Sequence, residues 1–274
     1  MTNPGPFPAT PASAHEWAEA FVTGRDMEAK LTPPPRPDLP GGETASAPAK
    51  RLSAPGRDPR LSIEESSKKA KTGGALTQPK RRAELIHRFL HHEVQAAELM
   101  AWAVLAFPDT PPAFRRGLFG ILDDELRHAN AYRSYLRNLG FDYGAFPVRD
   151  WFWERVPSVT SATGFVATMG MGLEGGNLDH TTRFAAQLLS AGDRKGSDLV
   201  TLVGDEEVSH VKFAVHWFRE FTGEPVRFDA WRASLPTPLS PVVMKGPALD
   251  RGLRSRAGMD EAFLAALDAW KMTP

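Results

Sequence analysis

Two copies of one pattern, a glutamate followed three residues later by a histidine, mark the residues of this chain that could do chemistry. They are Glu125 with His128, in the string Asp-Asp-Glu-Leu-Arg-His, and Glu207 with His210, in Asp-Glu-Glu-Val-Ser-His. Residues three apart share one face of a helix, so each pair can aim a carboxylate and an imidazole at one metal ion. A single pair of this kind arises by chance in many helices, and the second copy makes the pattern informative.

A lone glutamate precedes each pair at nearly the same distance. Glu93 lies 32 positions before Glu125 (125 − 93) and Glu174 lies 33 before Glu207 (207 − 174), each on an apolar helical stripe. With a turn near residues 109–110 and equal rise on both sides, Glu125 falls opposite residue ~94, which selects Glu93 rather than Glu98. The two halves therefore resemble a duplication with a period of about 81–82 residues.

These residues together predict a site for two metal ions. Ionised carboxylates on apolar faces are costly unless they are paired, and two divalent cations would balance four of them. Carboxylates and imidazoles without sulfur favour iron or manganese, so we expect two iron ions or a mixed manganese–iron pair. The predicted ligands are Glu93, Glu125, His128, Glu174, Glu207 and His210, with Glu125 and Glu174 as the bridging carboxylates.

Neighbouring residues leave alternatives open. Asp124 and Glu206 precede the two paired glutamates and could orient the opposite histidine, or lie on a solvated face. Tyr132, one turn after His128, could be redox-active or could be a packed core tyrosine. The many glycines around Glu174 indicate either close helix packing or a local bulge.

Four long helical stretches must position these ligands. Apolar periodicity predicts helices from about residue 79 to 106, from after Pro112 to near Gly140, from 158 to 190 and from 197 to 222. The first two and the last two are joined by short loops, and the irregular, aromatic stretch 141–157 is long enough to cross a bundle. This is the connectivity of a ferritin-like four-helix bundle, an all-α fold of two antiparallel hairpins joined by a long crossover.

The two ends of the chain differ from this central part, which we place at residues 78–223. Residues 1–77 are rich in Pro, Gly, Ala and Ser, and we expect a disordered low-complexity segment with one short helix from Ser13 to about Thr23. That helix could dock on the main domain or bind a partner. Residues 224–274 are predicted to be a Pro-rich wrap that ends in a short helix at about 259–271.

Composition limits the partners. Lys+Arg and Asp+Glu both number 33, so no overall charge favours nucleic acid or a membrane, and we interpret the basic residues at 68–82 as a solvated linker. There is no cysteine, which excludes disulfides, thiolate zinc sites and iron–sulfur clusters. Without a membrane-length apolar run or a recognisable signal segment, we expect a cytoplasmic protein.

Several strings resemble a known family. Glu93-Val94-Gln95-Ala96 looks like the ligand helix of ferritins and rubrerythrins, within the di-iron carboxylate superfamily. More closely, the chain resembles a bacterial ferritin-like family catalogued as domain of unknown function 455. The similar segments are 91–99, Leu173-Glu174 with Leu178-Asp179, 205–211 with Trp217-Phe218, and Lys245-Gly246-Pro247 with the Arg-rich stretch after it.

The resemblance implies the fold and a di-metal site, and the superfamily suggests the chemistry. We expect an oxidase or hydroxylase that activates O₂ or peroxide to act on a small molecule, with an electron donor, as a monomer or dimer. The alternatives are an iron-handling ferroxidase or peroxide-scavenging protein, and a non-catalytic interaction module. A shell-sized oligomer would favour iron storage.

Overall fold

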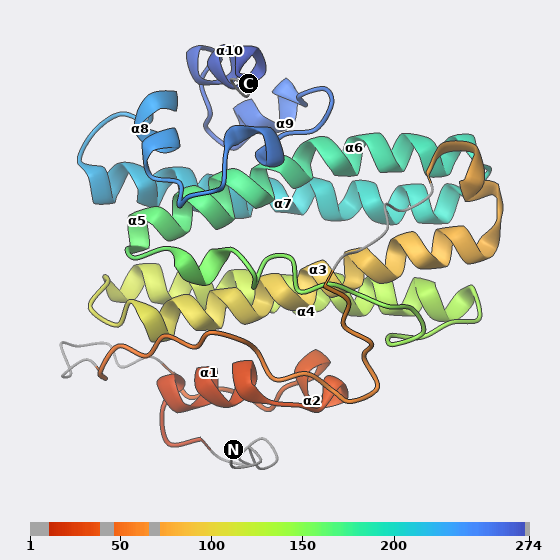
Figure 1. Cartoon of the computed structure of the whole chain (residues 1–274), viewed down its shortest axis with the longest axis horizontal. Coiled ribbons are helices and arrows are strands. Elements are labelled where there is room, and N and C mark those ends of the chain that lie inside the picture. The colour runs from red at the N-terminus through yellow and green to blue at the C-terminus, as the bar shows by residue number, and fades with distance from the viewer. Residues whose placement is uncertain (1–10, 39–46, 66–71, 272–274) are drawn as a thin grey trace. The chain divides into compact units, whose positions relative to one another are not determined.

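The structure, a computed structural model, describes residues 11–38, 47–65 and 72–271. Within these ranges the regular structure is helical and no β-strand forms (Figure 1), which confirms the all-α prediction. The chain forms two compact units, one of residues 1–71 and 78–157 and the other of residues 72–77 and 158–274. Their boundary falls at the end of the crossover, and the domain boundaries at 77 and 223 stay predictions.

A hairpin of two long helices forms the centre of the first unit. Helix α3 spans Pro79–Ala106 and α4 spans Pro112–Asn138, close to the predicted bounds. Both begin with proline. Amide hydrogens in the first turn of a helix have no partner within the helix, so the missing amide hydrogen of proline costs nothing there. The short loop between them makes the helices antiparallel neighbours, and their facing stripes are buried, including Leu90 and Leu122.

The N-terminal segment packs against this hairpin. Helix α1, Ala14–Thr23, begins at Ser13, whose hydroxyl accepts from the Glu16 amide, as predicted. Trp17 meets Phe119 of α4 edge-on at 5.9 Å between ring centroids, so the helix docks on its own unit. A second helix, α2 at Met27–Leu31, was not predicted. The predicted disorder also covers residues 1–10, 39–46 and 66–71, which lie outside the described residues.

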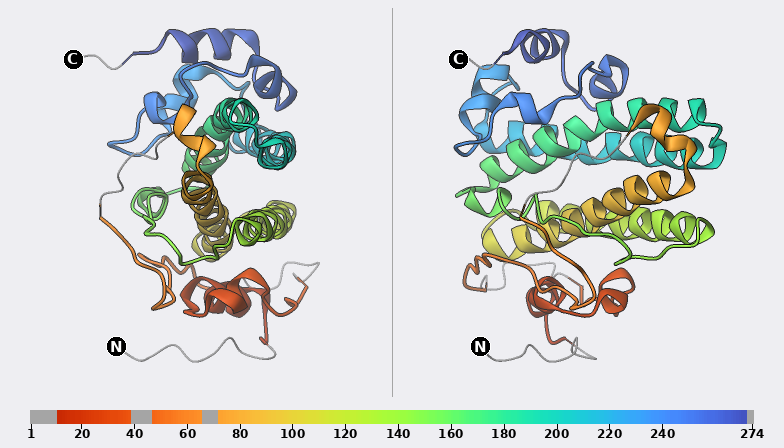
Figure 2. Two further views of the ribbon diagram at one scale, coloured as in Figure 1. Left: turned by 90° about the vertical axis from the view of Figure 1, so that its right-hand side faces the viewer. Right: turned by 45° about the vertical axis from the view of Figure 1, so that its right-hand side comes forward.

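Residues 47–65 lie along the same hairpin without helical structure (Figure 2). Backbone and indole hydrogen bonds attach them: the Lys50 amide donates to the Leu105 carbonyl, and Trp102 Nε1 donates to the Leu52 carbonyl, both at 2.9 Å. At Gly56 the chain approaches α1 so closely that a Cβ would lie 2.0 Å from the Thr23 carbonyl oxygen. Only glycine fits there.

The second unit is also built on a helical hairpin. One arm runs without a break through α5 (Ala162–Phe165), the π-helix η3 (Val166–Glu174) and α6 (Gly175–Ser190), and the other arm is α7 (Arg194–Thr222). A left-handed glycine follows each arm, Gly192 and Gly223, which is the residue that tolerates this conformation. Residues 73–77 form a short 3₁₀ turn, η1, beside α6.

Short helices complete the second unit. After α7 come α8 (Phe228–Ala233), the 3₁₀ turn η4 (Pro241–Met244), α9 (Arg251–Arg256) and α10 (Glu261–Ala269). They contact one another, the π-helix, α6 and α7. The predicted final helix corresponds to α10, whereas α8 and α9 were not predicted. Among the described helices, none is both long and apolar enough to cross a lipid bilayer.

Candidate metal centre

Three predicted ligands meet inside the first unit. Glu93 of α3 and Glu125 and His128 of α4 are all buried, and one ligand atom from each lies within 4.8 Å of the others. The His128 Nδ1 atom is 3.6 Å from a Glu93 carboxylate oxygen and 3.8 Å from a Glu125 oxygen. A single ion can bind two carboxylates and one imidazole at such a cluster.

The electrostatics of this cluster are those of an anionic site. Burial disfavours the imidazolium of His128, but hydrogen bonds and charges from Glu125 and Glu93 outweigh burial and raise the pKa of His128 from 6.5 to about 11. Without a metal ion, His128 is therefore protonated at neutral pH. A metal that binds through its ring nitrogen must displace that proton.

The second unit holds the other Glu-x-x-His pair. Glu207 and His210 lie on α7 and are buried, with 0% and 2% of their surfaces exposed. Their side chains already converge, because His210 Nδ1 lies 3.0 Å from a Glu207 carboxylate oxygen. The predicted geometry, in which one helical turn aims both side chains the same way, is present in both units.

Glu174 is the last residue of the π-helix and is buried. A π-helix closes i→i+5 hydrogen bonds and accommodates an extra residue per turn, a rare feature that occurs often at functional sites. Both alternatives raised for the glycines of this arm are present. The helix bulges, and Gly170 packs so tightly on α7 that a Cβ would lie 2.2 Å from Ala214 Cβ.

The neighbouring candidates make the following contacts. Asp124 pairs with Arg127 at 2.8 Å on a partly exposed face of α4. Glu206 is half-buried, and its backbone carbonyl accepts from the Ser209 hydroxyl. The Tyr132 ring is buried, with its centroid 5.8 Å from that of Phe89. Roles for Asp124, Glu206 and Tyr132 beside a metal stay predictions.

Glu98, which sequence spacing excluded as a ligand, belongs to a different cluster. Its carboxylate pairs with Lys30 of α2 and accepts from Arg57 Nη1 and Nη2 at 2.6 and 2.9 Å and from Trp153 Nε1 at 2.8 Å. On the same stripe, Gln95 accepts from the Phe152 amide. This stripe of α3 therefore binds the N-terminal segment and the crossover.

The same cluster continues to His91, which the sequence did not identify as part of a network. His91 Nδ1 is 2.6 Å from the Tyr143 hydroxyl, and Nε2 is 3.0 Å from Asp150, which also pairs with Arg57. The cations of Lys30 and Arg57 thus balance the carboxylates of Glu98 and Asp150 inside the unit. Partners this far apart in the chain leave no local sequence signal.

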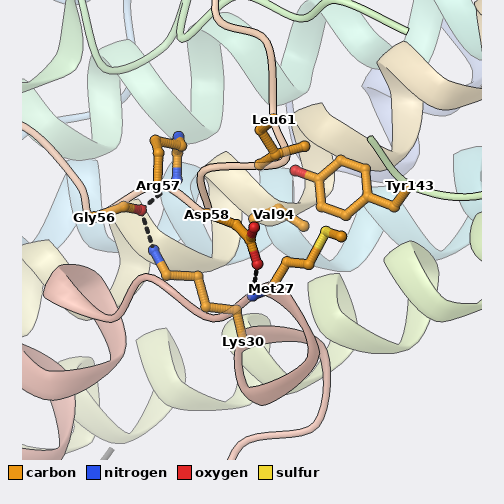
Figure 3. A pocket seen from close by; sticks show the side chains of 8 residues that line it. All are labelled: Met27, Lys30, Gly56, Arg57, Asp58, Leu61, Val94 and Tyr143. Atoms are coloured by element: carbon orange, nitrogen blue, oxygen red, sulfur yellow. Dashed lines mark hydrogen bonds between the residues drawn. The ribbon is translucent and has the colours of Figure 1, made fainter. Parts of the chain in front are cut away.

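A small cavity adjoins this cluster (Figure 3). It is lined by Lys30, Arg57, Asp58 and Tyr143 among others, and the volume open to the centre of a water molecule is about 10 Å³. That is close to the minimum for one water. Burial lowers the pKa of Lys30 to about 8, although Glu98 opposes the shift. Because the cavity has room for about one water molecule, we assign this cluster a structural role and not a role in substrate binding.

The donors present fit iron or manganese. The six predicted ligands offer oxygen and nitrogen only, and the chain has no cysteine. In the first unit, one divalent cation would balance the two buried carboxylates that lie beside His128. The chemistry of the donor set thus agrees with a metal centre.

Comparison with known proteins adds a family but no activity. The model of the family described as "Protein of unknown function (DUF455)" matches residues 10–265, most of the chain. No curated protein and no solved structure matches the chain.

Proposed function

This chain belongs to the DUF455 family, and we propose that it is a di-metal carboxylate protein that binds two iron ions, or one manganese and one iron. The single observation that carries the proposal is the buried cluster of Glu93, Glu125 and His128, with ligand atoms within 4.8 Å of one another. Buried carboxylates and imidazole at this spacing match the donors of a metal site better than they match an apolar core.

The second unit supplies the complementary set. Glu174, Glu207 and His210 repeat the ligand types of the first unit in the same order along the chain. We propose that each hairpin contributes two carboxylates and one imidazole, so that the six residues hold two ions. With neutral histidines, four carboxylates balance two divalent cations, which removes the charge cost of burial.

The proposed activity is the oxidation or hydroxylation of a small molecule. The bound ions would supply redox chemistry with O₂ or peroxide, which an electron donor would sustain. The chain's own residues would hold the ions, and the apolar faces around them would keep water out. His128 would give up its proton when a metal binds, because its raised pKa leaves it protonated beforehand.

The proposal is tested by metal content after anaerobic loading with Fe²⁺ or Mn²⁺. Wild-type protein should retain about two ions per chain, the number that six such ligands hold in di-metal carboxylate sites. E125Q and E207Q should each lose metal. D123N and D205N are matched controls two residues upstream, because these aspartates pair with Arg36 and Arg256; both variants should keep two ions.

Wild-type protein that retains less than one ion per chain would refute the proposal. Retention of both ions by E125Q and E207Q would refute the ligand assignment. The size of the loaded protein separates the proposed enzyme, a monomer or dimer, from an iron-storing shell. Oxygen uptake by the loaded protein with a reductant, absent from E125Q, would support redox activity over a role in interaction alone.

A further inference from the structure

The π-helix that ends at Glu174 is held by side chains from the C-terminal part of the same unit. The first is Trp231 of α8, which is fully buried and donates its indole N–H to the Ala167 carbonyl at 2.9 Å. Side-chain donors of this kind satisfy carbonyls at irregular points of a helix. The Trp231 ring stays in place by packing on Phe228 and Phe263.

A second contact comes from Met244 of η4, which covers the glycines of this arm. A Cβ on Gly172 would lie 2.6 Å from Met244 Sδ, and one on Gly176 would lie 3.2 Å from the Met244 carbonyl carbon. The bare glycine backbone is therefore what lets η4 sit against the π-helix and the first turn of α6. Larger residues at these positions would push the two segments apart.

A third contact fixes the segment that follows. Asp179 of α6, just past the π-helix, accepts from Arg254 Nε at 2.9 Å and Nη2 at 2.8 Å, and from the Gly246 and Asp250 amides at 2.8 Å. The side chains of Asp179 and Arg254 are fully buried. Four charge-assisted hydrogen bonds of this kind make a rigid attachment, and Arg254 also donates to the Met244 carbonyl.

We infer that Trp231, Met244 and Arg254 are positioning residues, which hold residues 166–174 in the π-helical conformation and thereby set the place of the Glu174 carboxylate. The link to a metal rests on the proposed function, whereas the link to the π-helix does not. A π-helix is less stable than an α-helix. If residues 166–174 relaxed to an α-helix, the side chains after this segment would turn about the helix axis by about 100° relative to those before it. Glu174, at its end, would leave the position from which it can bind an ion.

The test compares two tryptophan-to-phenylalanine variants. W231F removes the N–H bond to Ala167 and keeps an aromatic ring, and W102F removes an equivalent indole–carbonyl bond, to Leu52, in the first unit. Hydrogen exchange of metal-free protein is followed in peptides that cover residues 166–176. We expect about tenfold faster exchange there in W231F, from the loss of one buried hydrogen bond, and no change in W102F.

A second pair of variants covers the case in which W231F fails to fold. M244A removes the thioether that covers Gly172 and should also speed exchange of 166–176. K245M is its control, because Lys245 donates instead to the carbonyls of Leu267, Asp268 and Trp270 at the end of α10. K245M should loosen α10 and leave the π-helix unchanged.

The readout at the metal is anaerobic titration with Fe²⁺. In W231F and M244A, one of the two ions should bind more weakly, because the free variant relaxes from the π-helix and metal binding must restore it. In W231F the loss should be about tenfold, the equivalent of one buried hydrogen bond. Unchanged exchange of 166–176 in both variants would overturn the inference. Faster exchange with two ions bound as tightly as in wild type would overturn the role in placing Glu174. Wild-type protein that binds no Fe²⁺ refutes the proposed function, and exchange alone then decides whether the π-helix is held.

Discussion

Two buried glutamates five residues apart on α3 should respond to substitution in opposite ways. Glu98 accepts from Lys30, Arg57 and Trp153, whereas Glu93 lies beside His128 in the candidate metal cluster. E98Q and E93Q make the same chemical change at each position. They therefore separate a carboxylate that stabilises the fold from one that binds a metal.

For E98Q we expect a large loss of stability with metal content unchanged. The substituted amide would keep the shape of the Glu98 side chain but leave Lys30 and Arg57, both largely buried, without the carboxylate that pairs with both. Removing one partner of a buried ion pair costs about 3–5 kcal/mol. For a chain of this size that lowers the melting temperature by about 6–20 °C.

For E93Q we expect the reverse. The metal-free protein should change by no more than about 1 kcal/mol, since one carboxylate, Glu125, still faces the His128 imidazolium. With Fe²⁺ present, the variant should lose the extra stability that a bound ion gives wild type, which is about 2.7 kcal/mol at a hundredfold excess over Kd.

The assay is thermal and urea unfolding of wild type, E93Q and E98Q, each with and without Fe²⁺ under anaerobic conditions, together with metal content. An E98Q protein that is as stable as wild type would contradict the assignment of Glu98 to the buried ion network. An E93Q protein that Fe²⁺ stabilises as much as wild type would contradict the assignment of Glu93 as a ligand.

Three further predictions concern the pH dependence of stability, the packing of a glycine, and a buried ion pair. The pKa of His128 is raised from 6.5 to about 11, so protonation of His128 stabilises the metal-free protein fully below pH 6.5. That stabilisation should be lost as the pH rises from 6.5 to 11. The midpoints of urea unfolding should show this loss in wild type and not in H128Q. G170A places a Cβ 2.2 Å from a Cβ of α7 and should cost about 1–3 kcal/mol, measured by urea unfolding. G120A, where nothing lies within 4 Å, should instead stabilise by about 0.5–1 kcal/mol, and equal effects of the two glycine variants would contradict the packing. D179N should lower stability by about 3–5 kcal/mol, because Arg254 would stay buried without its counter-charge; a melting temperature equal to wild type would argue against that pair.

The hairpins could be predicted from the sequence because the physical signals are local. Apolar periodicity lies within each helix, and the prolines and glycines that mark its ends lie beside it in the sequence. The four long helices accordingly appear close to the predicted bounds. The choice of Glu93 over Glu98 needed only helical rise and the stripe that each residue shares. The bulge before Glu174 was one of two readings of the glycines, and both are present.

Other features depended on contacts between distant residues. Lys30, Arg57 and Asp150 meet across up to 120 positions, so no window of sequence shows them together. Composition suggested disorder on both sides of the predicted helix at 13–23, yet residues 24–38 and 47–65 are held in place. Leu31 and Leu61 are buried, the Leu31 carbonyl accepts from Asn130 of α4, and the Lys50 amide donates to Leu105 of α3. Helices α8 and α9 have six residues each, too few for a periodic signal.

The central claim, that six side chains hold two redox metal ions, is tested most directly by anomalous diffraction. Crystals of protein loaded anaerobically with Fe²⁺ and Mn²⁺ would be measured at the iron and manganese absorption edges. We predict two peaks at these edges, one ligated by His128 and the other by His210, with Glu93, Glu125, Glu174 and Glu207 completing the ligand set. No peak at either histidine, or ions bound only by other residues, would contradict the account.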